Sequence, residues 1–113
     1  RTLNPGRLVA IFQTHLYSRT QRLARRFGEA LALADVVAVL DVYPARERAE
    51  DFPGIDGRTI AGAVVDAAPG KTVYWLPDGD EAASVLEPRL RSDDLVLVLG
   101  AGNVDAVGRA LVS

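Results

Sequence analysis

The densest group of side chains that could do chemistry follows the first apolar run, in the segment 13–20 (QTHLYSRT). Arg19 could bind a carboxylate or a phosphate, because a guanidinium offers paired hydrogen bonds to such anions. His15, the single histidine of the sequence, could donate a hydrogen bond to an anionic ligand or accept one from an amine ligand. We therefore predict that His15 and Arg19 bind a ligand, and that Tyr17 lines the cleft or packs over the start of the next helix. The alternatives are a solvated arginine and a loop histidine bonded to the backbone.

Two glycines after the last apolar run, Gly100 and Gly102, could let the backbone approach a ligand or adopt a positive φ. An ordinary turn would use them equally well. Tyr43, beyond the second apolar run, is a further candidate for lining the cleft. For this tyrosine and its neighbours Asp41 and Glu47, a solvated loop is the default expectation.

The residue types also exclude several kinds of site. With no cysteine and one histidine, thiolate chemistry, disulfides and a histidine-rich metal site are excluded, and we expect no metal site. The turn after the first apolar run lacks glycine, so it carries neither a dinucleotide fingerprint nor a phosphate-binding loop. The net charge of −2 argues against a nucleic-acid partner. No apolar run approaches the roughly 20 residues of a membrane span, so we expect a cytoplasmic chain without a membrane partner.

The candidate residues must be positioned by alternating strands and helices. Apolar runs of strand length predict strands over 8–12, 36–40, 72–76 and 95–99. Apolar residues at helical spacing predict helices over 19–34, 56–68, 78–90 and 104–112.

Local signals mark the ends of these helices. Ser18 and Gln21 predict a capping box at the start of the first helix, and Asp56 predicts the cap of the second. The second helix is expected to bury a stripe that includes Ala67. Pro88 is expected to kink or end the third helix, because proline removes a backbone hydrogen bond.

The alternation predicts an α/β fold, a doubly wound and mostly parallel Rossmann-like sheet with helices on both faces. We expect about four strands in the spatial order 3-2-1-4, with the third strand at an edge and both faces of the apolar strands covered. In that order the ends of the first and fourth strands flank the switch point, where such sheets bind ligands. The loops 13–19 and 100–103 are then neighbours.

Three segments carry a resemblance to the C-terminal domain of the Mur ligases: 12–20 (FQTHLYSRT), 40–47 (LDVYPARE) and 100–104 (GAGNV). In those Mur ligases that join L-alanine to UDP-N-acetylmuramate, the first segment usually reads F-Q-P-H-x-Y-[ST]-R-T. The resemblance covers nearly the whole chain. It implies that residues 1–113 form the amino-acid-binding, closing domain of a longer three-domain enzyme of peptidoglycan precursor synthesis.

In such an enzyme, the resemblance implies, ATP and Mg²⁺ are bound mainly by another domain and the UDP-sugar by a third. The muramyl carboxylate becomes an acyl phosphate, which the amine of L-alanine attacks. His15 and Arg19 would lie on the L-alanine or phosphate side, with no catalytic residue assigned to this domain. Water would be excluded when the domain closes. The isolated chain is expected to be inactive.

Three positions depart from the family pattern. Thr14 replaces a proline, which we expect to loosen the loop. Leu16 stands where many members have arginine, so Arg19 alone would hold the amino-acid carboxylate. Asn103 replaces a common aspartate. The alternatives to this interpretation are a free-standing, non-catalytic binding or regulatory module, and the same domain of a sister Mur ligase that adds another amino acid.

Overall fold

A computed structural model describes residues 6–100, apart from the side chain of Asp80. The predicted helix over 104–112, with Gly102 and Asn103 before it, lies outside the described residues. Within residues 6–100, four strands and three α-helices follow one another, with short 3-10 turns at Ala49–Asp51 and Glu87–Arg89. In chain order the strands and α-helices are β1 (Leu8–Gln13), α1 (Tyr17–Leu31), β2 (Val36–Val39), α2 (Gly57–Ala67), β3 (Thr72–Trp75), α3 (Gly79–Leu86) and β4 (Leu95–Gly100).

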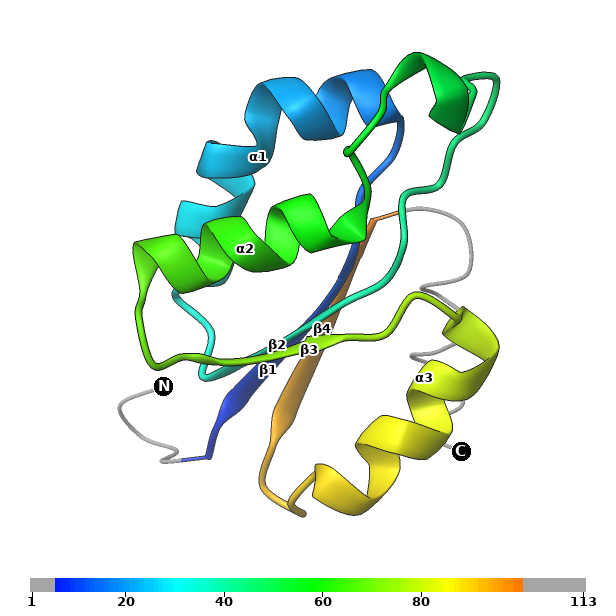
Figure 1. Ribbon diagram of the computed structural model, residues 1–113. Helices are drawn as coiled ribbons and strands as arrows, with labels where there is room; N and C mark the ends of the chain where they lie inside the picture. Colours follow the sequence, from blue (N-terminus) through cyan, green and yellow to red (C-terminus); the bar gives the residue numbers. More distant parts are fainter. Residues whose placement is uncertain (1–5, 101–113) are drawn as a thin grey trace.

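The four strands form one parallel sheet in the order β3-β2-β1-β4. In the registers, Val9 pairs with Val36 of β2, and Gln13 pairs with Gly100 of β4. Figure 1 shows α1 and α2 on one face of the sheet and α3 on the other. The predicted α/β class, the strand order and the edge position of β3 are confirmed.

The core consists of two apolar layers, one on each side of the central strands. Alternate residues of a strand point to opposite faces, so β1 and β2 contribute to both layers. The layer under α1 and α2 contains Ala10, Phe12, Leu31, Ala34, Val37, Val39, Ile60 and Val64. The layer under α3 contains Ile11, Ala38, Leu40, Ala82 and Leu86.

Helices α1 and α2 cross in close contact because Gly28 has no side chain. A Cβ atom on Gly28 would lie 2.5 Å from the carbonyl carbon of Ala63. Gly57, the first residue of α2, is equally confined, because its Cβ would lie 2.3 Å from the carbonyl oxygen of Leu40. These two glycines set the distance between α2 and its neighbours.

The start of α1 differs from the sequence prediction. The helix begins at Tyr17, two residues before the predicted start, and ends at Leu31, three residues before the predicted end. The predicted capping box of Ser18 and Gln21 is wrong, because Leu16 is the N-cap residue and Ser18 already lies inside the helix. Leu16 has a φ of 72°, which is unusual for a residue with a side chain.

The predictions for the other helix ends are mostly confirmed. Asp56 caps α2 in a capping box with Thr59, and α2 ends before Pro69. Pro88 lies in the 3-10 turn that follows the end of α3. Ala67 is exposed rather than part of the buried stripe, because it borders an open hollow between α1 and α2.

Strand β4 is covered on one face only among the described residues. Val96 and Val98 pack against the layer under α3. On the other face Leu95, Leu97 and Leu99 are 57%, 41% and 42% exposed. The helix predicted over 104–112 lies outside the described residues, so the covering of this face of β4 stays a prediction.

A bidentate ion pair joins the start of β1 to the turn before β4. Arg7 donates from Nε and a terminal nitrogen to the two carboxylate oxygens of Asp94, over 3.0 and 2.8 Å. Asp94 also accepts from the amide of Arg91 over 2.8 Å, and its side chain is 1% exposed. Hydrogen bonding from Arg7 holds the pKa of Asp94 below its ordinary value.

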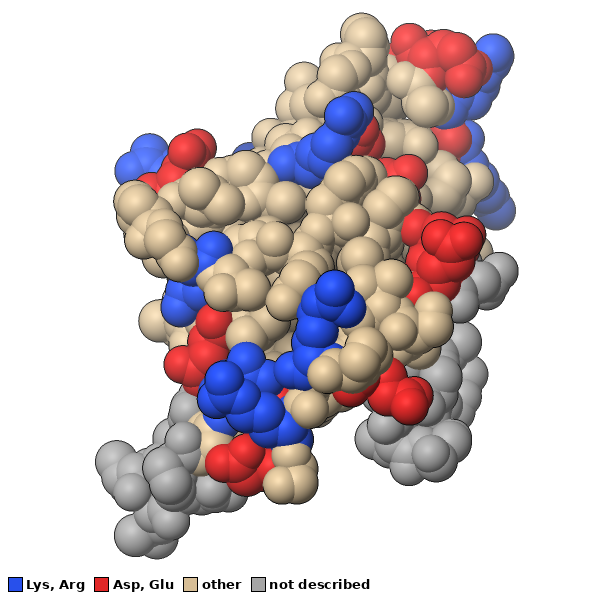
Figure 2. Space-filling model, turned by 60° about the horizontal axis from the view of Figure 1, so that its bottom comes forward, with Lys and Arg blue, Asp and Glu red and all other residues tan. Residues whose placement is uncertain are grey.

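The surface carries both signs of charge. Figure 2 shows basic and acidic side chains distributed over one face of the molecule, many of the basic ones beside an acidic one. Among the described residues, no helix has the length and apolar character to cross a membrane.

Candidate functional site

A small hollow lies at the carboxyl ends of β1 and β4, where a doubly wound sheet offers its ligand site. Its volume is about 190 Å³. His15, Arg19 and Gly100, which the sequence singles out from two distant segments, all line it. The complete lining is Phe12, Gln13, Thr14, His15, Arg19, Phe27 and Gly100.

Arg19 supplies the positive charge of the hollow. It is the third residue of α1 and is exposed. Its side chain forms no hydrogen bond or ion pair with any residue between Gly6 and Gly100. The guanidinium is therefore available to a carboxylate or phosphate, which it would bind through two parallel hydrogen bonds.

An apolar wall faces this charge. The rings of Phe12 and Phe27 lie with their centroids 5.1 Å apart and tilted by 49°. The hollow thus combines one cation with a small apolar surface, a combination that suits a small ligand with an anionic group and a short apolar one.

His15 is half-buried and fixed by the chain segment that follows β2. The backbone on both sides of His15 is hydrogen-bonded to Tyr43. The amide of Leu16 donates to the carbonyl of Tyr43, and the amide of Tyr43 donates to the carbonyl of Thr14, both over 2.9 Å. The imidazole stacks on the ring of Tyr43, with centroids 5.7 Å apart and planes 23° apart. The ring of His15 therefore has a defined place at the rim of the hollow.

Gly100 closes the hollow from the β4 side. Its φ is 118°, which disfavours residues with a side chain, and a Cβ there would lie 2.0 Å from the carbonyl oxygen of Gln13. The predicted positive φ is confirmed. Glycine is required here by the contact between β1 and β4.

Three buried polar side chains support the floor of the hollow. Gln13, 6% exposed, donates from its amide to the carbonyl of Asp41 over 3.0 Å. The hydroxyls of Thr14 and Thr20 lie 3.0 Å apart, and Thr20 Oγ1 lies 2.7 Å from the carbonyl oxygen of Leu16. Thr14 therefore makes a buried hydrogen bond that the proline of the family pattern cannot make.

The loop after β2 is bonded to this site. Glu47 accepts from the amide of Ser18 over 3.0 Å, and its other carboxylate oxygen accepts from the hydroxyl of Ser18. These hydrogen bonds hold the pKa of Glu47 below its ordinary value. The prediction of a solvated loop is wrong for Glu47, because the start of α1 needs an acceptor that its own first turn does not contain.

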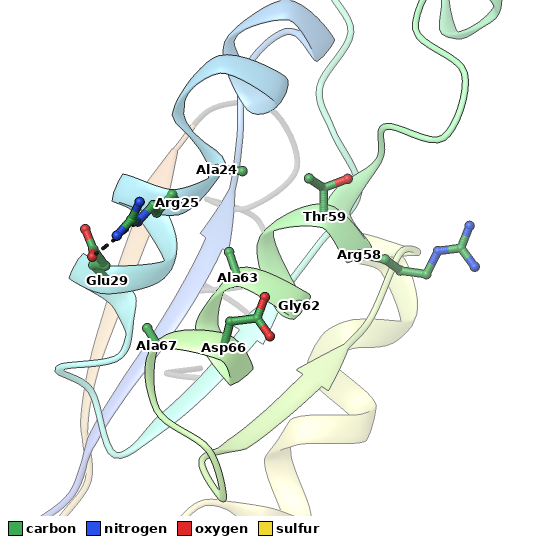
Figure 3. A pocket seen from close by; sticks show the side chains of 9 residues that line it. All are labelled: Ala24, Arg25, Glu29, Arg58, Thr59, Gly62, Ala63, Asp66 and Ala67. Carbon is green, nitrogen blue, oxygen red and sulfur yellow. Dashed lines mark ion pairs between the residues drawn. The ribbon is translucent and has the colours of Figure 1, made fainter.

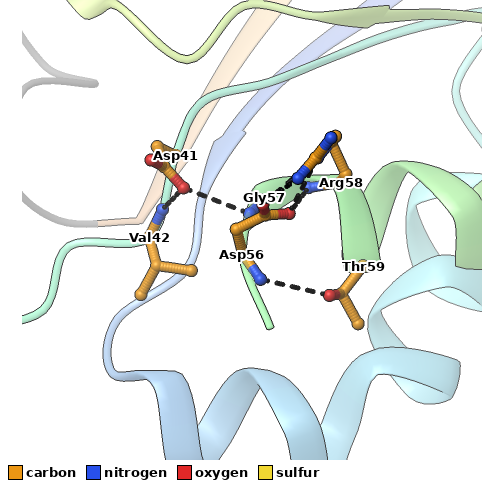
Figure 4. A network of polar contacts seen from close by, with 6 residues as sticks. All are labelled: Asp41, Val42, Asp56, Gly57, Arg58 and Thr59. Carbon is orange, nitrogen blue, oxygen red and sulfur yellow. Dashed lines mark hydrogen bonds and ion pairs between the residues drawn. The ribbon is translucent and has the colours of Figure 1, made fainter. Parts of the chain in front are cut away.

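Asp41 fastens the same loop to the start of α2 (Figure 4). One carboxylate oxygen accepts from the amides of Val42 and Gly57, over 2.9 and 3.2 Å. Next to it, Asp56 caps α2 and binds the guanidinium of Arg58, whose hydrogen bonding lowers the pKa of Asp56. Asp41 is thus a structural carboxylate, not a solvated one.

The two tyrosines lie beside the hollow and are not among its lining residues. Tyr17 stacks on Phe52, with centroids 6.0 Å apart, as the prediction of packing over the helix start requires. Partial burial, followed by the charge of Asp41, raises the pKa of the Tyr17 hydroxyl. Tyr43 contacts the site by stacking on the ring of His15. Gly102 lies outside the described residues.

A larger hollow, of about 670 Å³, lies between α1 and α2 (Figure 3). Its lining includes several small residues, among them Gly62 and Ala63. Its charged side chains include Arg25 and Glu29, which lie 3.8 Å apart on α1. None of the residues of the three motif segments lines it, so the smaller hollow is the candidate site.

The described residues contain neither a group of metal-ligating side chains nor a glycine-rich loop for the phosphates of ATP. No group of three or more histidine or acidic side chains between Gly6 and Gly100 is placed to hold a metal ion. The turn after β1 contains no glycine, so it offers side chains rather than a run of glycine amides to an anion.

Sequence reasoning identified the charged residues of the site but missed the residues that support it. Gln13, Thr14 and Phe27 line the hollow, and Glu47 and Asp41 fix its rim. The one signal for Gln13 was its place directly after an apolar strand. No local signal indicates that Glu47 reaches α1.

Comparison with known proteins places the chain in a family. Residues 1–102 match the family described as "Mur ligase, glutamate ligase domain". Curated relatives called "UDP-N-acetylmuramate--L-alanine ligase" include those of Cutibacterium acnes, 48% identical over 95% of this chain, and Kineococcus radiotolerans, 50% identical over 91%. A third, from Mycolicibacterium smegmatis, is 44% identical over 97%. The chain spans about a fifth of their length, 22%, 21% and 21%. From the motifs, the sheet and these matches together, the chain belongs to the Mur ligase family and corresponds to its C-terminal domain.

Proposed function

We propose that this chain is the amino-acid-binding, closing domain of a three-domain, ATP-dependent ligase that joins L-alanine to UDP-N-acetylmuramate. The observation that carries the proposal is the convergence of His15, Arg19 and Gly100 on one hollow at the ends of β1 and β4. The names of the relatives supply the substrates. The setting is the cytoplasmic synthesis of peptidoglycan precursors.

In this proposal Arg19 binds the carboxylate of L-alanine, and the apolar wall of Phe12 and Phe27 accommodates its methyl group. His15 hydrogen-bonds the amino acid at the rim, where Tyr43 fixes its ring. Leu16 adds no second guanidinium, so Arg19 is the cation of this hollow among its described lining residues.

The other chemistry belongs to the remainder of the parent protein, because the described residues contain neither a group of metal-ligating side chains nor a glycine-rich phosphate loop. That remainder activates the muramyl carboxylate as an acyl phosphate and binds the UDP-sugar. This domain presents the amine of L-alanine and, on closing, excludes water from the activated carboxyl group. Alone, the 113 residues bind neither ATP nor the UDP-sugar and catalyse no ligation.

The test is Arg19→Ala in the full-length ligase. We expect the KM for L-alanine to rise by roughly 10- to 150-fold, the equivalent of the about 1.5–3 kcal/mol that a charge-assisted hydrogen bond contributes. Arg22→Ala, an exposed arginine on the same helix that does not line the hollow, is the matched control. An unchanged alanine KM in folded Arg19→Ala enzyme would refute the role of Arg19.

Two further measurements separate the alternatives. Phosphate release from ATP with glutamate, lysine or a tripeptide, but not with alanine, would identify a sister ligase. Sequencing the reading frame upstream of the codon for Arg1 should reveal a G-x-G-K-[ST] motif some 200 residues away or more. A start codon a few residues upstream would instead indicate a free-standing module without ligase activity.

A further inference from the structure

Helix α1 begins without an acceptor of its own. The first four amides of a helix have no partner inside it, and a side-chain oxygen usually binds one of them. The N-cap residue here is Leu16, whose side chain has no polar atom, and the first turn contains no acidic residue. The acceptor is supplied by Glu47, 29 positions along the chain, through the amide and hydroxyl of Ser18.

The segment that carries Glu47 also holds His15. Between Tyr43 and Glu47 the chain makes a tight turn, in which the amide of Glu47 donates to the carbonyl of Pro44 over 2.9 Å. At the start of this turn Tyr43 pairs with the backbone on both sides of His15 and stacks on its ring. At its end Glu47 holds Ser18. The segment 43–47 thus contacts the segment 14–18 at both ends.

The residue between these contacts is strained. Leu16, with a φ of 72°, separates His15 from the first turn that carries Arg19. A residue with a side chain keeps such a conformation only where the surroundings hold it. The contacts from 43–47 lie on both sides of Leu16 and supply that constraint.

We propose that Glu47 is a positioning residue for amino-acid binding: it fixes the turn 14–18 so that His15 and Arg19 face the same hollow. The inference rests on the proposed function, which gives the hollow its ligand. Glu47 does not line the hollow and acts through Ser18.

The experiment compares Glu47→Ala, Glu47→Gln and Glu50→Ala in the full-length ligase. Glu50 is the matched control, because it lies on the same loop, is exposed and pairs with Arg48 over 2.9 Å. We expect Glu47→Ala to raise the KM for L-alanine roughly tenfold, with the KM for ATP changed less than about twofold. Glu47→Gln keeps an acceptor for the Ser18 amide and should recover most of the alanine affinity. Glu50→Ala should behave as the wild type.

A second readout does not depend on activity. His15 is the single histidine of the chain, so its imidazole protons give one set of NMR signals from the 113 residues. Loss of the Glu47 contact should release Tyr43 from the His15 ring and shift these signals, whereas Glu50→Ala should leave them in place. Far-UV circular dichroism checks the fold. If Glu47→Ala does not fold, Glu47→Asp takes its place, because it keeps the charge but has a shorter side chain. We expect it to raise the KM for L-alanine about threefold.

The outcomes distinguish this inference from the proposed function. If Arg19→Ala raises the KM for L-alanine while the Glu47 variants change neither that KM nor the His15 signals, the positioning role is overturned and the proposed function stands. If Arg19→Ala leaves the alanine KM unchanged, the amino-acid-binding role of Arg19 is refuted and the positioning role fails with it, whereas absence of any ligation with alanine in the wild type would refute the proposed function itself. A rise in the KM values for alanine and ATP alike would also overturn the inference, because it would indicate a general structural effect.

Discussion

Replacing Gly28 by alanine should push helices α1 and α2 apart. The new Cβ would lie 2.5 Å from the carbonyl carbon of Ala63 and 2.6 Å from its Cβ and carbonyl oxygen. Ordinary contact begins at 3.4 Å, so the helices must separate by about 0.9 Å. Neither helix can yield locally, because the atoms in the way are mainly backbone atoms.

The magnitude follows from two opposing effects. Overpacking costs about 1–3 kcal/mol, whereas replacing glycine inside a helix gains about 1 kcal/mol. The clash is with backbone atoms, so we expect the upper part of the overpacking range, about 2–3 kcal/mol. The net loss is then about 1–2 kcal/mol, and the Tm should fall by about 4–8 °C for a domain near this size.

Gly62→Ala is the matched control for this change. Gly62 lies in α2, is exposed, and a Cβ there would have no atom within 4 Å. The same substitution should therefore stabilise the domain by about 0.5–1 kcal/mol and raise the Tm by about 2–4 °C. Thermal and urea unfolding followed by circular dichroism measures both variants. If Gly28→Ala is as stabilising as Gly62→Ala, the close crossing of the helices is refuted.

Two further predictions concern the contacts of β1 with β4. Asp94→Asn should cost about 1–3 kcal/mol at neutral pH. Hydrogen bonding from Arg7 lowers the pKa of Asp94 in the folded protein below its ordinary value. The extra stability of the wild type over Asp94→Asn should therefore be present above that ordinary pKa and disappear as the pH falls through the lower pKa of the folded state. A difference in the free energy of unfolding by urea that does not change with pH would contradict this. Gly100→Ala should cost more than about 2 kcal/mol, because the Cβ would meet the carbonyl of Gln13 and φ is 118°. Unfolding measurements showing unchanged stability would rule out that close contact.

The sheet could be predicted from the sequence because its signals are local. Each strand is a short apolar run, and the alternation with helices leaves few ways to connect parallel strands. The same topology brought His15, Arg19 and Gly100 together, since the carboxyl ends of parallel strands meet at one edge.

What could not be predicted depends on contacts between distant segments. Ser18 and Gln21 have the spacing of a capping box, but Glu47 satisfies the helix start from 29 positions away and the helix begins earlier. The strain at Leu16 has the same origin, because only contacts with the loop after β2 hold it there. The exposed leucines of β4 have the same sequence pattern as buried ones, so only the arrangement of the helices distinguishes them.

The central position of β1 has a consequence for biosynthesis. It pairs with β2 on one side and with β4 on the other, and β4 is the last described strand to leave the ribosome. Until then β1 is an apolar edge strand with unpaired backbone groups, which is a template for pairing with other chains. The hollow also lacks Gly100 at that stage. A growing chain therefore gains its protected sheet and its complete ligand site in the same late step, when β4 is added.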